Sequence, residues 1–166
     1  MPPSAPPLLL TRREPVGPGG PEAEDPLRLA LSARQRTSLR GHRRSLCGTD
    51  LVLQLPRGAP LLAGEWLTGP TEEPWVRVEA APERLLAVRS GDAMALLQAA
   101  YHLGNRHVVL QLLPGELRLE EDPVLADLLR GRGLEVEPLR APFEPEPGAY
   151  APSHLHRHSH GAASSP

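Results

Sequence analysis

The stretch that decides the fold is SGDAMALLQAAYHLGNRHVVLQLL, from Ser90 to Leu113. Its apolar positions recur at helical spacing: Ala93, Leu96, Leu97, Ala100 and Tyr101. The pattern therefore predicts a helix that Ser90 or Asp92 caps and that ends near Leu103, with Gly104 as the left-handed residue of the C-cap. The apolar run from 108 to 113 predicts a strand directly after this helix.

The segments on either side of this stretch continue an alternation of strands and helices. Leu85 to Val88 reads as a strand before it, and a turn at Pro114-Gly115 leads into a strand from Glu116 to Leu119. Further segments complete the pattern: a helix that starts at Asp122-Pro123 and ends at Gly131 and Gly133, and a strand from Leu134 to Leu139. The order strand, helix, strand, strand, helix, strand predicts a ferredoxin-like sandwich of sheet and helices.

The N-terminal half has a different periodicity. Apolar residues alternate in Leu27 to Leu31, Leu51 to Leu55 and Val76 to Val78, with glycine and proline between these runs. This pattern indicates half-buried strands joined by turns. We therefore expect an α+β protein with an all-β N-terminal domain (26–81), a ferredoxin-like metal-binding domain (82–146), a disordered N-terminal tail (1–25) and a flexible His-containing tail (147–166).

The composition excludes several classes of function. The net charge of −2 and an aromatic content of 3% argue against a nucleic-acid binder. The single Cys47 cannot form an internal disulfide, and no apolar run is long enough for a membrane helix. The sequence contains none of the short motifs of zinc peptidases, serine hydrolases or phosphate-binding loops, so we expect that the protein is not an enzyme. Because no membrane helix is expected, we also expect a cytoplasmic protein.

One set of segments closely resembles the UreE family of urease accessory proteins, in order as well as in spacing. The segments are Leu55-Pro56-Arg57-Gly58, Gly64 to Leu67, Val88-Arg89, Ala100 to Gln111 with Gly104-Asn105-Arg106-His107 at its centre, Leu125 to Gly133, Ala141 to Glu146 and Gly148 to Tyr150. The resemblance covers about Leu27 to Tyr150, and a His-rich tail follows as in that family.

The resemblance implies a homodimeric nickel chaperone. A member of this family binds Ni²⁺ and passes it to the urease apoprotein together with a GTPase partner and other accessory proteins. His107 corresponds to the nickel ligand that each subunit contributes at the dimer interface. This chain has Glu120-Glu121-Asp122-Pro123 where some members carry a His-x-His pair, so an accessory site built on that pair is not expected here.

The residue chemistry agrees with metal delivery. Imidazole accepts Ni²⁺, Zn²⁺ or Cu²⁺, so Zn²⁺ or Cu²⁺ can substitute for the nickel cargo. The candidate ligands are His107, His102, His154, His156, His158 and His160. By default His102 would be a capping or core residue, and the tail histidines would be a solvated tract. A nickel store dominated by the tail is the alternative function, and the pattern leaves open whether dimers associate further around metal.

Arginines cluster around His42 in the N-terminal half. They are Arg34, Arg36, Arg40, Arg43 and Arg44. A run of charges of this kind is usually a solvated face, and docking of an acidic partner surface is the functional interpretation. Asn105 and Arg106 are expected to orient the loop that carries His107.

Overall fold

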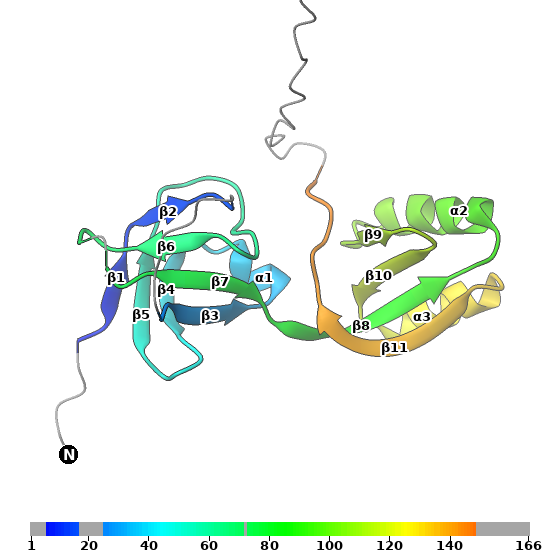
Figure 1. Ribbon diagram of the computed structural model, residues 1–166. Coiled ribbons are helices and arrows are strands. Elements are labelled where there is room, and N and C mark those ends of the chain that lie inside the picture. Colours follow the sequence, from blue (N-terminus) through cyan, green and yellow to red (C-terminus); the bar gives the residue numbers. More distant parts are fainter. Residues whose placement is uncertain (1–5, 17–24, 72, 149–166) are drawn as a thin grey trace, which may run out of the picture.

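The computed structural model describes residues 6–16, 25–71 and 73–148. Figure 1 shows a lobe of strands that carries the short helix α1, and a lobe in which α2 and α3 accompany the sheet that contains the long strands β8 and β11. The elements in chain order are β1 (Leu8–Leu10), β2 (Arg12–Glu14), β3 (Leu27–Leu31), α1 (Ala33–Arg36), β4 (Arg40–Arg44), β5 (Asp50–Gln54), β6 (Trp66–Thr68), β7 (Val76–Ala80), β8 (Pro82–Arg89), α2 (Ala93–Gly104), β9 (Gln111–Leu113), β10 (Glu116–Glu120), α3 (Pro123–Gly131) and β11 (Glu135–Pro142). The chain is thus a mixed α+β protein dominated by strands.

The N-terminal half contains two sheets with a common core. Their strand orders are β1-β5-β4 and β2-β6-β7-β3. Alternate residues of each strand point to opposite faces, so the leucines and valines of period two all reach the same side of their sheet. The buried cluster is Leu10, Leu29, Leu31, Leu51, Leu53, Leu55, Leu61, Leu67, Val76 and Val78.

The predicted disordered segment 1–25 is wrong for the residues that form β1 and β2. Leu8 to Leu10 pair in parallel with Leu51 to Leu53, and Leu10 is fully buried. β2 pairs with β6. The segment is rich in proline and glycine, which predicts disorder, but its three consecutive leucines pair with β5. Residues 1–5 and 17–24 lie outside the described residues.

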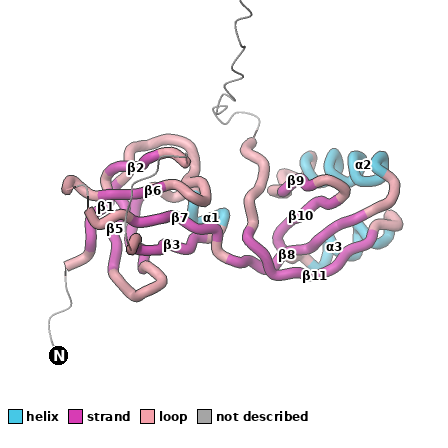
Figure 2. The backbone as a smooth tube through the Cα atoms, viewed as in Figure 1, coloured by secondary structure: helices cyan, strands magenta, loops and turns pink. Residues whose placement is uncertain are grey.

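The C-terminal half is one antiparallel sheet with the strand order β11-β8-β10-β9. Its core joins one face of the sheet to α2 and α3, and Figure 2 shows the two kinds of element in this lobe. The buried cluster is Leu86, Val88, Leu96, Ala99, Leu103, Leu117, Leu119, Ala126, Leu129, Leu134 and Val136. This core is separate from the N-terminal one, so each half is held by its own apolar cluster.

Both long helices begin where the sequence predicts. The carboxylate of Asp92 accepts a hydrogen bond from the amide of Met94, and that of Asp122 accepts from the amides of Val124 and Leu125. Such side-chain acceptors satisfy amides that have no partner within the first turn. After α3 the chain turns at Gly133, whose φ is 80°.

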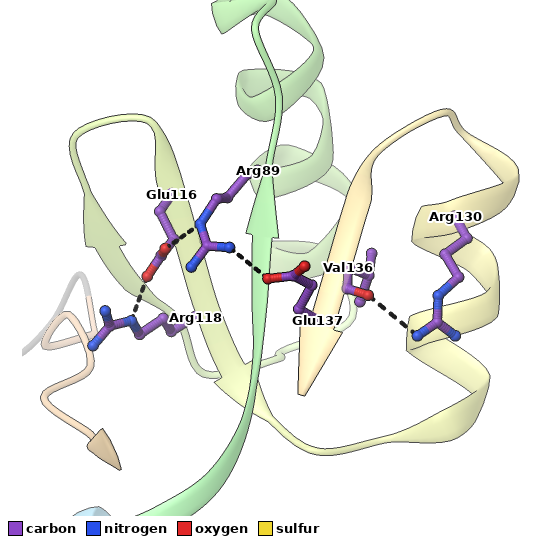
Figure 3. A network of polar contacts seen from close by, with 6 residues as sticks. All are labelled: Arg89, Glu116, Arg118, Arg130, Val136 and Glu137. Atoms are coloured by element: carbon purple, nitrogen blue, oxygen red, sulfur yellow. Dashed lines mark hydrogen bonds and ion pairs between the residues drawn. The ribbon is translucent and has the colours of Figure 1, made fainter. Parts of the chain in front are cut away.

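Polar contacts brace the face of the C-terminal sheet that the helices leave free (Figure 3). The guanidinium of Arg89 on β8 contacts Glu116 on β10 at 2.6 Å and Glu137 on β11 at 2.8 Å. Arg118 donates a second hydrogen bond to Glu116. Burial opposes ionisation of Glu116, but the hydrogen bonds from Arg118 and Arg89 outweigh it and lower the pKa of this carboxyl. The network therefore joins three strands through the guanidinium of Arg89, which lies between the carboxylates of Glu116 and Glu137.

A buried arginine joins the two halves. Arg36, which is 5% exposed, donates from Nη2 to the carbonyl oxygen of Phe143 at 2.6 Å and from Nη1 to that of Leu31 at 3.4 Å. Burial lowers the pKa of this guanidinium, and the nearby carboxylates of Glu144 and Glu83 counteract the effect. The contact fixes the chain that leaves β11 against the N-terminal half.

Candidate metal centre

The loop that carries His107 is shaped by the end of α2. The amide of His107 donates to the carbonyl oxygen of Gly104 at 2.9 Å, and the amide of Val108 donates to that of Leu103 at 3.1 Å. This pair of bonds, spanning three and five residues, is the Schellman arrangement that ends many helices. In this arrangement the residue at position 107, whose Cα lies between the two amides, must adopt a left-handed backbone conformation.

His107 occupies that left-handed position, with φ of 58°, and it is the only residue other than glycine with a positive φ in the part of the chain that the structure describes. The expectation that Gly104 takes this role is wrong, because Gly104 is the last residue of α2 and the turn closes three residues later. A side chain in this conformation costs about 1–3 kcal/mol, and such strain tends to be kept at functional sites. The His107 side chain is exposed.

His102 lies in the last turn of the same helix and is half-buried. Its ring meets the edge of Tyr101 with 5.6 Å between the ring centroids. The carboxyl end of a helix carries a partial negative charge that favours a nearby cation. His102 therefore lies within this field, next to the loop of His107, and its ring also packs against Tyr101.

The outward face of α2 is apolar, which the sequence interpretation missed. Leu97 and Tyr101 belong to the apolar pattern that predicts the helix, but they are 63% and 68% exposed, and Met94 is exposed on the same face. Leu96, Ala99 and Leu103 form the buried face instead. The signal was available in the sequence, since a helix that is apolar on all sides is usually covered on all sides.

The same apolar surface extends beyond the helix. Val109 follows His107 in the loop, and Leu112 lies on β9, the edge strand of the sheet; both are exposed. Leu112 stands opposite Leu117 in the register, so it is on the face of the sheet that α2 covers. β9 is shorter than the predicted strand from 108 to 113, because the amide of Val108 still bonds to the carbonyl oxygen of Leu103 at the end of α2. The apolar face of α2, Val109 and Leu112 together flank the loop of His107.

The segment that leads into the C-terminal tail is attached beside this loop. The amide of Glu146 donates to the carbonyl oxygen of Leu110 at 2.7 Å, and the amide of Glu144 donates to Oε1 of Gln111 at 3.3 Å. Leu110 is three residues from His107 in the chain. The tail therefore begins close to the candidate ligand, a relationship that the sequence did not indicate.

The described part of one chain does not hold a complete metal site. No group of three or more histidine, cysteine, aspartate or glutamate side chains gathers within residues 6–16, 25–71 and 73–148. The candidate ligands His154, His156, His158 and His160 lie outside the described residues. Within those same ranges, no helix is long and apolar enough to cross a membrane.

Comparisons with known proteins show what the chain is similar to. The family model described as the C-terminal domain of UreE urease accessory protein matches residues 83–165, half of the chain. A urease accessory protein UreE of Synechococcus sp. strain WH7805 is 52% identical over 153 residues, which are 89% of this chain and 86% of that protein. The proteins of the same name from Parasynechococcus marenigrum and Azotobacter vinelandii are each 49% identical, over 81% and 83% of this chain and 87% and 82% of their own.

The family match and the relatives define an accessory protein of urease maturation, which is not itself an enzyme. More narrowly, the chain belongs to the UreE family.

Proposed function

We propose that this protein is a nickel chaperone that carries Ni²⁺ to the urease apoprotein through a site shared by two copies of the chain. His107 of each copy is the central ligand. The observation that carries the proposal is the exposed, left-handed His107 flanked by the exposed apolar face of α2. Family membership supports the urease role.

The apolar surface favours a homodimer. Met94, Leu97 and Tyr101 lie one helical turn apart on α2, and nothing in the described chain covers them. Large exposed apolar surfaces mark interaction sites, and a symmetric contact between two copies buries each residue twice. A two-fold axis beside this face brings two His107 side chains toward each other, so one ligand per chain becomes a pair.

Imidazole chemistry suits a carrier. Neutral imidazoles bind Ni²⁺, Zn²⁺ and Cu²⁺, whereas a cage of thiolates would retain a soft metal more tightly. A site with few protein ligands binds its cargo loosely enough for transfer to another protein. Ligation requires the neutral ring, so affinity for nickel falls as the solution is acidified.

The tail histidines can add ligands to the shared site. His154 lies eight positions after Glu146, which is bonded to Leu110. An extended chain of that length spans at most about 29 Å. His154, His156, His158 and His160 are thus tethered within reach of the loop of His107. His102, one turn before the loop, is a secondary ligand in this proposal.

The finer features of the proposal follow from the family and the topology. The strand order β11-β8-β10-β9 with two helices on one face supports a ferredoxin-like C-terminal domain from Pro82 to Glu146. Transfer of nickel involves a GTPase partner and the other urease accessory proteins, and we expect it to take place in the cytoplasm.

A nickel store dominated by the tail remains the alternative function, and one experiment separates the two. Nickel binding is measured by calorimetry for the full chain, for His107→Ala, for His102→Ala and for the chain truncated after Tyr150. The chaperone proposal expects truncation to lower the stoichiometry and leave a site that needs His107, while His102→Ala retains most of the affinity. Loss of all binding on truncation would favour the store.

Urease activation provides the second measurement. At limiting nickel, His107→Ala is expected to reduce activation of the urease apoprotein, whereas saturating nickel restores it. Normal activation by His107→Ala at limiting nickel would contradict the delivery role.

A further inference from the structure

We propose that a pocket in the N-terminal half, between the start of β4 and the end of β5, docks an acidic peptide segment of a partner protein. The pocket encloses about 350 Å³ and is lined by Thr37, Ser38, Leu39, Arg40, Leu55, Arg57 and Gly58. It includes part of the Leu55-Pro56-Arg57-Gly58 turn, which is not part of the candidate metal centre. α1, β4 and β5 border it in the strand-rich lobe (Figure 1).

The pocket combines an apolar base with a cationic rim. Leu55 is fully buried and Leu39 half-buried, whereas the side chains of Arg40 and Arg57 are exposed. The two hydroxyls are already engaged, since Thr37 donates to the carbonyl oxygen of Arg34 and Ser38 to that of Arg40. Recognition at the rim therefore depends on the two guanidinium groups, which match carboxylates in shape and charge.

The charge of this region is unbalanced. Between Ser32 and Gly64 the sequence has six arginines and a single carboxylate, Asp50. Asp50 lies 3.9 Å from Arg44, and Arg36 is turned inward to Phe143. Among the described residues, no carboxylate pairs with Arg40 or Arg57. The carboxylates of Glu83 and Glu144 approach this region from elsewhere in the chain, but they face the amide of Ala33 and the buried Arg36. Arg40 and Arg57 therefore leave the rim of the pocket locally positive, which attracts acidic segments.

The edge of the neighbouring sheet indicates how such a segment binds. β4 is an edge strand, and the Arg43 guanidinium donates to the outward carbonyl oxygens of His42 at 2.8 Å and Ser38 at 3.4 Å. These contacts cover the edge against the addition of another strand. The segment therefore binds through its side chains: an apolar residue contacts Leu39 and Leu55, and flanking carboxylates contact Arg40 and Arg57.

The test uses a fluorescein-labelled peptide of repeated Glu-Asp-Leu and its uncharged counterpart of repeated Gln-Asn-Leu. Fluorescence anisotropy is measured with the full chain, with the double variant Arg40→Gln/Arg57→Gln, and with the control Arg132→Gln/Arg140→Gln. The control removes the same charge from exposed arginines of the C-terminal half. We expect the acidic peptide to bind the double variant about tenfold more weakly and the control within about twofold of the full chain.

Other results would overturn the proposal. Equal weakening in both double variants would reduce the effect to overall charge, and equal binding of the uncharged peptide would remove the role of the arginines. Competition by single-stranded RNA that exceeds competition by the unlabelled acidic peptide would assign the surface to nucleic acid. Because all four arginines are exposed, thermal unfolding should be unchanged, and nickel stoichiometry should be unaffected by Arg40→Gln/Arg57→Gln.

Discussion

The amide of Val108 bonds to the carbonyl oxygen of Leu103, and this bond closes α2 around a histidine in a conformation that normally belongs to glycine. Backbone stability would be served better by glycine at position 107. The strain and the exposed imidazole occur at the same residue. The proposed ligand role therefore requires histidine at position 107, whereas stability favours glycine there.

Substitutions at position 107 separate these demands. His107→Gly removes the imidazole and the strain, whereas His107→Ala removes only the imidazole and keeps a Cβ in the left-handed region. We expect the glycine variant to be about 1 kcal/mol more stable than the alanine variant in urea unfolding of metal-free protein. Both variants should lose the shared nickel site equally. A more stable alanine variant would contradict the backbone assignment.

The outward face of α2 predicts the oligomeric state. Leu97→Glu places a charge in the middle of the apolar face, so the proposed dimer should dissociate into monomers in sedimentation velocity. Val124→Glu is the matched control, because Val124 is 75% exposed and lies on the other helix, α3. The control should retain the dimer. A Leu97→Glu protein that remains dimeric would show that another surface joins the copies.

Glu116 predicts a dependence of stability on pH. Its pKa is lowered in the folded protein, so its contribution is present above the unfolded value of about 4.3 and is lost as pH falls through the folded pKa. Glu116→Gln should cost about 1–2 kcal/mol at pH 7, and the difference from the natural chain should shrink at acid pH. Glu137→Gln is the control on the same arginine; with a 70% exposed side chain, it should cost less than about 0.5 kcal/mol. A difference that does not depend on pH would exclude ionisation as the cause.

Arg36 predicts how firmly the two halves are joined. Arg36→Met keeps much of the volume but leaves the buried carbonyl oxygen of Phe143 without its donor. We expect a loss of about 2 kcal/mol in urea unfolding and faster hydrogen exchange at the amide of Glu146. Arg34→Met, an exposed change on the same short helix, should stay within about 0.5 kcal/mol. Unchanged exchange at Glu146 would mean that its bond to Leu110 holds without the arginine.

Local signals in the sequence predicted most of the C-terminal half. Asp92 and Asp122 are strong helix starts, and the observed strands follow the predicted order because the turns at Pro114-Gly115 and at Gly133 separate the apolar runs. The exposure of Leu97 and Tyr101 was not predicted, because helical spacing alone does not distinguish a buried face from an exposed one.

Other features depended on partners that are distant in the sequence. β1 forms because Leu8 to Leu10 meet β5, more than forty residues away, and composition carries no information about that pairing. The candidate site was only partly predictable. The sequence named His107 as a candidate ligand, but its left-handed conformation and the nearby Glu146 result from bonds that form only in the folded chain.

In the proposed nickel site, the bond between Glu146 and Leu110 also sets the strength with which the tail histidines compete for metal. A ligand on a short flexible tether meets its target at an effective concentration on the order of millimolar. Free imidazole or a histidine-rich receiver must exceed that concentration locally to replace the tail. A glycine-serine insert after Gly148 would lengthen the tether and lower this effective concentration. A weaker competitor would then remove the nickel, although the ligands themselves are unchanged.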